Sequence, residues 1–323
     1  MNKKYVKYAA LILGLAFVNQ SFPMDNKQSQ RTKDIASALA SIGFTYGFCR
    51  FILPEVYKRI TTYEDASPET QQWAKKVMQD CGEDIGSIPL KKGTKGDGWS
   101  VKCGSVITVP ENFDLNKCSE QELLQHMHSL KHEFKHFKNN DHANRAAMVA
   151  ATISFGGLLT QESSSFLTKP AIVFTGYGVD MAYTRYRESE ADRFGYEKAT
   201  SREELEATKN MFLNQGACIK YALLTDPTMI EGNFVENKIL SVLSQKIKNN
   251  IQSEASATLN DPLKIKEMLN KQENFFDAAV FVMDREHPSW KSRADMAQDY
   301  IDKWDEKYRK KLSAADLKFN KAV

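Results

Sequence analysis

The feature that most constrains this chain is a cluster of histidines between residues 128 and 142. Four of its six histidines lie in the short stretch HSLKHEFKHFKNNDH, where His132, Glu133 and His136 form an H-E-x-x-H sequence. On a helix, side chains four residues apart lie one turn apart on the same face, so both imidazoles can reach one ion. Zinc binds neutral imidazole readily, and the neighbouring glutamate can act as a general base. The pattern therefore predicts a metal-binding helix.

The residues around the motif favour a helix. Ser119 and Glu122 have the spacing of a capping box, and helical periodicity continues from there through the motif. Two alternatives stay open at this point. One is a solvated face of histidine and lysine without a metal, and the other is a register one turn earlier, in which His128 and His132 bind the ion. The earlier register has no glutamate directly after its first histidine and therefore no base. The other nearby histidines are interpreted as polar neighbours of the site: His126, His128 and His142.

A catalytic zinc site needs a third protein ligand. The downstream stretch AYTRYRESEADRFGYEKA offers Glu188, Glu190 and Glu197, and only Glu188 is followed four residues later by an aspartate, Asp192. We therefore expect Glu188 to bind the metal and Asp192 to accept the N–H of a ligating imidazole, which fixes the orientation of that ring. Gly195 keeps this face small, so that a second helix can approach it. The alternative is a charged surface helix in which neighbouring arginines pair with the acids.

Helix and strand signals predict an α+β fold that is predominantly helical. Residues 101–109 are rich in β-branched side chains with period-two character and are followed by Pro110, which predicts a strand or hairpin. Ser67 and Pro68 predict the start of a helix, and from Ser119 onward the patterns are almost entirely helical. The expected architecture is a small β-sheet beside the metal-binding helix.

Charge and composition narrow the class of protein. Hydrophobic residues make up 42% and charged residues 26% of the chain, as in an ordinary globular protein. The formal net charge is only +3, and no basic stripe is interleaved with aromatic residues, which excludes nucleic acid as the main partner. The five cysteines include no C-x-x-C pair. A bridge among Cys81, Cys103 and Cys118 and a set of buried thiols are both compatible with this spacing.

The N-terminus has the layout of an export signal. Three lysines in MNKKYVKY precede the apolar run AALILGLAFV, which is too short to cross a bilayer comfortably. We interpret residues 1–23 as a signal peptide or, if uncleaved, an N-terminal anchor. Residues 24–66 are expected to form a linker and an N-terminal helix, interrupted at Pro54, that packs on the body of the protein rather than on a membrane surface.

Three motifs in this order resemble a known family. H-E-x-x-H is followed by TRYRESEAD, which matches [ST]-R-x-x-E-x-x-A-D, and later by HPSWKSR, which matches H-P-x-x-x-x-R. These three motifs, in this order, resemble those of the zinc metallopeptidases that include HtpX and the CAAX prenyl proteases, peptidase family M forty-eight. The resemblance covers roughly residues 67 to 295. The stretch GSVITVPENF also resembles the edge strand that precedes the metal helix in that family.

The resemblance implies a gluzincin-like zinc metallopeptidase domain over residues 67–303, followed by a charged helical tail over residues 304–323. One zinc per chain is expected on His132, His136 and Glu188. Glu133 is then the base that activates a zinc-bound water, and the reaction is hydrolysis of peptide bonds in protein or peptide substrates. The substrate is expected to lie extended against the strand at residues 101–109.

Two further residues enter only through the resemblance. His287 is expected to be a catalytic residue beside the cleft, where it aids the oxyanion. Arg293 is expected near the cleft as well, where it aids the oxyanion or orients acidic groups around the metal ligands. Without the resemblance, a histidine followed by proline predicts no more than a turn or the start of a helix.

The chain also departs from the membrane members of that family. The segments 146–160 and 170–183 lie where those members have spanning helices, but both are short here, and the second contains Asp180. We expect buried helices that flank the site, and therefore the soluble, exported branch, located in the bacterial periplasm or cell envelope. Two alternatives stay open: a non-catalytic zinc-binding or chaperone-like envelope protein on the same scaffold, and a membrane-surface adaptor whose histidines are incidental.

Overall fold

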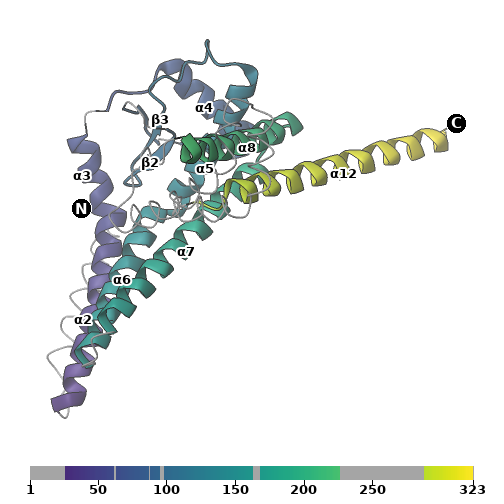
Figure 1. The fold of residues 1–323 in the computed structure, drawn as a ribbon. Coiled ribbons are helices and arrows are strands. Elements are labelled where there is room, and N and C mark those ends of the chain that lie inside the picture. Colours follow the sequence, from purple (N-terminus) through teal and green to yellow (C-terminus); the bar gives the residue numbers. More distant parts are fainter. Residues whose placement is uncertain are drawn as a thin grey trace. The chain divides into compact units, whose positions relative to one another are not determined.

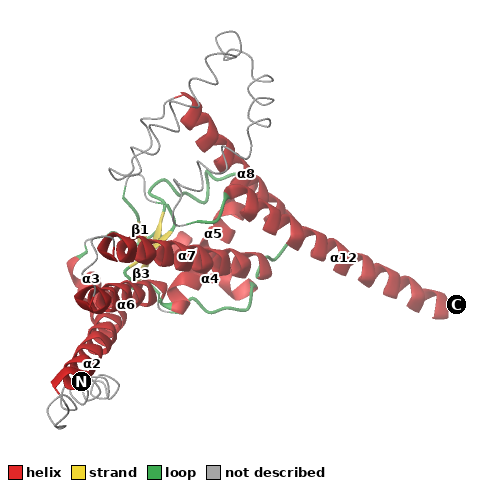
Figure 2. Cartoon of the chain, turned by 60° about the horizontal axis from the view of Figure 1, so that its bottom comes forward, coloured by secondary structure: helices red, strands yellow, loops and turns green. Residues whose placement is uncertain are grey.

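The computed structural model describes residues 26–61, 63–86, 88–94, 98–162, 168–225 and 287–322. The signal segment expected at residues 1–23 lies outside these residues. Contacts divide the chain into two units, the first comprising Met1–Cys118 and Ser129–Ala191 and the second Ser119–His128 and Asp192–Val323. Helices dominate, and a small sheet accompanies them (Figures 1 and 2). The predicted fold class, mainly helical α+β, is confirmed.

The first unit begins with a long helical stretch. It consists of α2 (Asn26–Gly47), a π-helical turn η1 (Phe48–Ile52) and α3 (Leu53–Ile60). Helix therefore begins at Asn26, near the start of the segment expected to open with a linker, and it continues past Pro54. A proline within a helix lacks an N–H and crowds the carbonyl four residues back. The π turn, in which the Leu53 N–H bonds to the Phe48 carbonyl, widens the helix at this point and accommodates the ring.

The sheet is three-stranded, with the order β1-β3-β2. β1 (Leu90–Lys92) pairs in parallel with β3 (Val106–Val109), and β2 (Ser100–Lys102) pairs with β3 in antiparallel fashion. The predicted hairpin is thus confirmed, as β2 and β3. The expectation that the GSVITVPENF stretch is an edge strand is wrong, because β3 is the central strand and all four of its residues are buried. Its β-branched side chains fit a strand covered on both faces.

The two edges of this sheet differ. The outer side of β1 is occupied, because Lys91 forms a bridge with Asp65 and the Lys92 N–H donates to the Glu64 carbonyl over 2.8 Å. On the other side of the sheet, β2 is the edge strand of the described residues. An extended peptide can add to a sheet only at such an edge.

Helices around the sheet complete the first unit. α4 (Pro68–Asp80) begins at Ser67, whose hydroxyl accepts the Thr70 N–H over 3.2 Å, and buries Ala74 and Met78. α6 (Asp141–Glu162) packs along α2 and η1, and it continues through the glycines at 156–157. α7 (Thr168–Glu197) runs beside α6 (Figure 1). The Arg145 guanidinium of α6 donates two hydrogen bonds to the Asp180 carboxylate of α7.

The second unit is a helical core. α8 (Arg202–Thr225) packs against α12 (Trp290–Ala322), which includes the residues expected to form a charged tail. The buried cluster between them comprises Tyr196, Leu205, Phe212, Ala294, Ala297 and Ile301. Gly216 allows close packing here, since a Cβ at this position would lie 3.1 Å from the Cβ of Trp290.

Candidate metal centre

The H-E-x-x-H motif lies in α5 (Glu120–Asn139), as the sequence predicts. The helix starts with the expected capping box. The Ser119 N–H donates to Glu122 Oε2 over 2.7 Å, and the Glu122 N–H donates back to Ser119 Oγ over 3.3 Å. These bonds satisfy two backbone N–H groups at the helix start and fix where its turns begin. The position of the start determines which face of α5 carries the two histidines.

Three potential ligand atoms converge between α5 and the second half of α7. His132 Nε2 lies 3.0 Å from His136 Nε2 and 3.0 Å from Glu188 Oε2, while His136 Nε2 lies 3.2 Å from Glu188 Oε1. Donors bound at 2.0–2.1 Å around a tetrahedral zinc are about 3.3 Å apart. The observed separations and the two-imidazole, one-carboxylate donor set therefore fit a zinc ion. All three residues belong to the first unit.

The electrostatics of these ligands show a site built for a cation. Burial opposes ionisation of Glu188, but hydrogen bonds from His132 and His136 outweigh it and hold the pKa of the carboxyl well below its usual range. Burial likewise favours neutral His136, but the carboxylates of Asp141 and Glu188 outweigh it and raise its pKa to about 10. Without a metal, protons on the imidazoles stabilise this cluster through hydrogen bonds to the carboxylates. A metal ion that binds here displaces those protons.

Glu133 sits beside the ligands, facing the edge of the sheet. Its Oε1 lies 4.0 Å from His132 Nε2, and its Oε2 accepts the N–H of Val101 in β2 over 2.9 Å. Burial raises the pKa of Glu133, an effect that the neighbouring His132 and His136 oppose. A buried carboxylate with a raised pKa next to a metal site is suited to accept and return a proton. The edge strand of the sheet thus holds the candidate base directly.

A carboxylate that sequence reasoning missed orients His136. Asp141 Oδ2 lies 2.7 Å from His136 Nδ1, so the ring directs Nε2 toward the other ligands. Asp141 is placed by Asn140, whose positive φ of 57° ends α5 and turns the chain into α6. The Arg187 guanidinium donates to Asp141 and to Glu190, which fixes the carboxylate in turn. The only sequence signal is an acidic residue shortly after the second histidine, in HFKNNDH.

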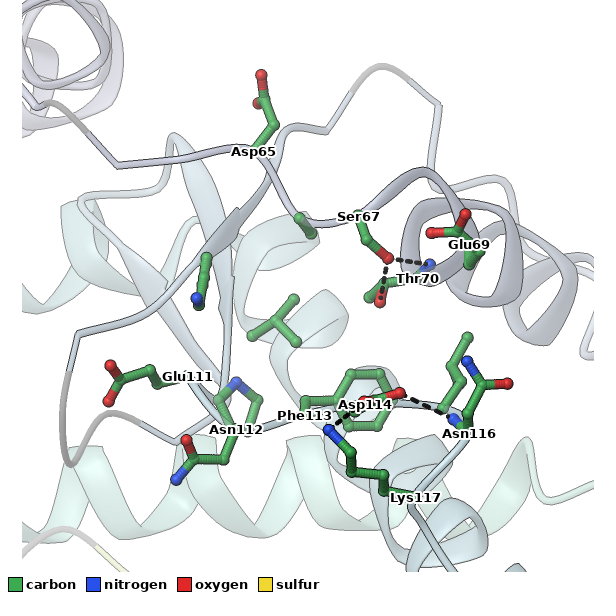
Figure 3. A pocket seen from close by; sticks show the side chains of 15 residues that line it. Asp65, Ser67, Glu69, Thr70, Glu111, Asn112, Phe113, Asp114, Asn116 and Lys117 are labelled. Carbon is green, nitrogen blue, oxygen red and sulfur yellow. Dashed lines mark hydrogen bonds and ion pairs between the residues drawn. The ribbon is translucent and has the colours of Figure 1, made fainter.

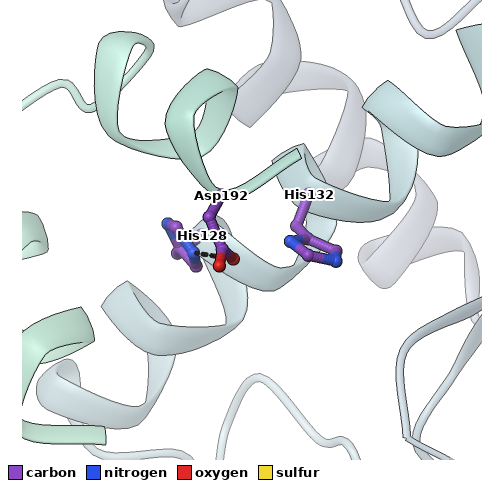
Figure 4. Close-up of side chains that lie close together, drawn as sticks. All are labelled: His128, His132 and Asp192. Carbon is purple, nitrogen blue, oxygen red and sulfur yellow. Dashed lines mark ion pairs between the residues drawn. The ribbon is translucent and has the colours of Figure 1, made fainter. Parts of the chain in front are cut away.

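Asp192 and Arg293 meet inside the second unit. Arg293 donates two parallel hydrogen bonds of 2.7 Å to the Asp192 carboxylate, and both side chains are buried. His128 Nε2 lies 3.7 Å from Asp192 Oδ1, and Figure 4 shows this pair together with His132, one turn further along α5. The hydrogen bond expected from a ligating imidazole to Asp192 stays a prediction.

The surroundings of His128 favour the later register of the motif. Its ring stacks on Tyr196 with centroids 4.8 Å apart and packs edge-on against Phe212. Gly195 lies against the same ring, since a Cβ there would come within 2.6 Å of it, which is the small-residue contact that the sequence predicts. The shared carboxylate of Asp192 is already neutralised by Arg293. His128 is therefore built into the packing of the second unit.

The remaining histidines lie elsewhere. His142 Nε2 is 2.8 Å from the Cys49 carbonyl oxygen, which joins α6 to η1. Burial lowers the pKa of His126, while Glu122 opposes this effect. His287 stacks on Trp290 in the second unit with ring centroids 6.1 Å apart. Its expected catalytic role stays a prediction.

A separate pocket lies at the other end of the sheet. Its volume is about 680 Å³, and it is lined by residues from the start of α4, the end of β3 and the loop after it, including Glu69, Val109, Phe113 and Lys117 (Figure 3). None of the three candidate ligands lines it, nor does Glu133. The pocket is therefore not the cleft of the metal centre.

Comparison with family models decides what kind of protein carries this centre. The model of Peptidase family M48 matches residues 115–299, more than half of the chain. The chain belongs to peptidase family M48. The matched range includes all of α5, the Glu188 segment of α7 and Arg293. Comparisons with curated proteins and with solved structures found no match.

Family M48 consists of metallopeptidases, so the chain belongs to a class of enzymes whose substrates are proteins or peptides. It also explains why the H-E-x-x-H helix and the glutamate of α7 face one another. The match does not separate the soluble, exported branch of M48 from its other branches, so that assignment stays a prediction.

Proposed function

We propose that this M48 protein is a zinc-dependent metalloendopeptidase of the cell envelope. The observation that carries the proposal is the convergence of His132, His136 and Glu188 at separations that suit a tetrahedral ion, with Glu133 beside them. Zinc bound there would supply a Lewis acid that lowers the pKa of water and polarises the scissile carbonyl.

The protein groups around the ion have distinct roles. Glu133 takes the proton from the attacking water and delivers it to the leaving amine, which is general base and then general acid catalysis by one carboxyl. Its burial and raised pKa suit both steps. Asp141 holds the His136 ring in place, so that the ligand set does not have to reorganise when a substrate arrives.

The substrate is proposed to bind along β2, the edge strand of the described sheet. The Val101 N–H to Glu133 hydrogen bond puts this edge next to the base. An extended peptide that pairs along Ser100–Lys102 would take over the Val101 N–H and free the Glu133 carboxylate to accept a proton. This narrows the expected substrate strand, residues 101–109, to its first part. β3 is already paired on both sides and cannot accept a peptide.

A zinc titration with a graded set of variants tests the ligand assignment. Wild-type protein is expected to bind about one zinc per chain, while His136→Ala and Glu188→Ala lose stoichiometric binding because each removes a ligand. Asp141→Asn keeps all three ligands but weakens the orientation of His136, so zinc affinity should fall about 10–100-fold. Affinity is measured by competition with a chromogenic chelator.

Two other histidines serve as controls for this titration. His126 lies on the same helix but is not a proposed ligand, so the His126→Ala variant should bind zinc as the wild type does. If His136→Ala retains zinc while His128→Gln loses it, the register one turn earlier is correct and His136 is not a ligand.

Membrane attachment is proposed to involve the first helical stretch. Among the described residues, Gln30–Ile60 is the one helical stretch long and apolar enough to cross a membrane by length and composition, and it is barely buried. Large apolar side chains such as Phe44 and Ile60 are 57% and 70% exposed.

Vesicle flotation of the chain starting at Met24 tests this attachment. The protein is expected to float with vesicles, and Ile35→Glu with Leu39→Glu, at two exposed positions of α2, should reduce the floating fraction at least tenfold, because charged groups cost about 2.5–3.5 kcal/mol each in a bilayer. Tyr308→Glu, a charge placed at an exposed aromatic residue of α12, is the matched control. Equal flotation of the double variant and the control would contradict the proposal.

A further inference from the structure

We propose that Cys49 and Cys103 form a disulfide that ties the β2–β3 hairpin to the N-terminal helix. Both cysteines belong to the first unit, and both are reduced and partly accessible in the structure. They come from elements far apart in sequence, η1 and the hairpin turn. The inference is independent of the peptidase chemistry but rests on the proposed location in the cell envelope, where oxidants are present.

The first observation is the backbone of the hairpin turn. Cys103 has a φ of 48° and Gly104 a φ of 60°, and the Ser105 N–H donates to the Lys102 carbonyl over 3.0 Å. Two central residues with positive φ define a type I′ turn, which favours Asn, Asp or Gly at both positions. A cysteine at the first of these positions costs conformational energy that Asn or Gly would avoid. A thiol held at such a position suggests a use for the sulfur.

The second observation places Cys49 next to that turn. His142 Nε2 lies 2.8 Å from the Cys49 carbonyl oxygen. The same imidazole lies against Gly104, where a Cβ would come within 1.9 Å of the ring. One ring therefore touches both the backbone of Cys49 and the residue after Cys103. Glycine is required at position 104 for two reasons: the His142 ring leaves no room for a Cβ, and the φ angle is positive.

The third observation concerns the two thiols themselves. Burial raises the pKa of both thiols, and the charge of a Cys103 thiolate raises the pKa of Cys49 further, which agrees with the proximity of the two residues around His142. The shared contact with His142 thus favours this pair over the bridges within the set Cys81, Cys103 and Cys118.

Bond formation requires a disulfide oxidant, such as oxidised glutathione. The thiolate of one cysteine attacks the oxidant and releases one reduced thiol, leaving a mixed disulfide. The second cysteine thiolate then displaces the remaining group as a second reduced thiol. The two cysteines lose two electrons and two protons, which the oxidant accepts as two thiols. An exported protein meets such oxidants, since disulfides persist in the periplasm and outside the cell.

The bond would fix the strand that carries the substrate edge. Val101, whose N–H holds Glu133, lies two residues before Cys103 in the same hairpin. Cross-linking this turn to η1 joins segments more than fifty residues apart, and a loop of that length gives a disulfide a large entropic effect. We expect oxidation to raise the melting temperature by roughly 10 °C.

Peptide mapping tests the pairing on the full chain, because trypsin separates all five cysteines. After treatment with oxidised glutathione and alkylation of free thiols, peptide 34–50 should be linked to peptide 103–117, and dithiothreitol should release both. Linkage of Cys103 to any other cysteine, a stable mixed disulfide with glutathione, or complete alkylation of both thiols would each overturn the proposal.

Cys103→Asn provides a second readout. It keeps a side chain that favours the turn and removes only the thiol. Its melting temperature without oxidant should equal or exceed that of the reduced wild type. It should then show no rise with oxidised glutathione, while the wild type does. A rise of the same size in Cys103→Asn would show that the oxidant acts elsewhere.

Discussion

Replacing Glu133 with glutamine is expected to abolish peptide hydrolysis while leaving zinc binding intact. The amide keeps nearly the same size but cannot accept the proton from water, so kcat/KM for an unfolded protein substrate should fall about 10²–10⁴-fold. Zinc binding should be unchanged, because Glu133 lies beside the three proposed ligands but is not one of them. Cleavage is measured with casein or a fluorogenic peptide, and zinc by the chelator assay.

Glu120→Gln is the matched control for this variant. It makes the same chemical change on the same helix, at an exposed position in the first turn of α5. Its activity should equal that of the wild type. Full activity of Glu133→Gln would show that another group acts as base and would end the proposed mechanism.

The same pair of variants separates the peptidase from a non-catalytic scaffold. A zinc-binding or chaperone-like protein needs the ligands but has no use for a base beside them. If the wild type and Glu133→Gln bind zinc equally and neither cleaves any substrate, the scaffold function is favoured. A difference in cleavage with equal zinc content supports the enzyme.

The part of the site carried by one helix can be predicted from the sequence. The capping box at Ser119 and Glu122 fixes the start of α5, and the spacing of four residues then puts His132 and His136 on one face. The sequence also predicts Glu188 as the acid that meets them, and the structure brings it to within 3.2 Å of both rings. These features depend on local periodicity, which a sequence displays directly.

Features that depend on long-range packing cannot be predicted in this way. Residues 106–109 are the most β-branched and suggest the edge strand, yet such residues occupy the strand that is paired on both sides. Asp141 escapes prediction because its contact with His136 depends on the turn at Asn140 rather than on helical spacing. Pro54 suggests a helix break, whereas a π turn accommodates it.

Replacing Arg293 with alanine is expected to give the largest loss of stability in the second unit. Its guanidinium donates two hydrogen bonds of 2.7 Å to Asp192 and lies 4.1 Å above the ring of Phe212. Removing it leaves the buried carboxylate without its guanidinium partner. Such a loss costs about 3–5 kcal/mol of unfolding free energy. Urea denaturation followed by tryptophan fluorescence measures the change, and hydrogen exchange in α8 and α12 assigns it to this unit.

An ion pair at the surface provides the comparison. Arg202 also contacts an aspartate, Asp305, over 2.8 Å, but both side chains are more than a third exposed. Arg202→Ala should therefore destabilise the protein far less than Arg293→Ala, because water screens an exposed pair. Equal effects of the two substitutions would mean that the Arg293 pair does not act as a buried charge contact.

The combination of Arg293→Met with Asp192→Asn distinguishes a buried charge from lost packing. If the penalty of the single Arg293→Met variant comes from the uncompensated carboxylate, removing that charge as well should restore a large part of the stability, since two neutral groups of similar size need no counter-ion. If the double variant is as unstable as the sum of the singles, packing of the guanidinium on Phe212 carries the effect instead. Arg293 is then a packing residue of the second unit, and orientation of Asp192 is not its main contribution.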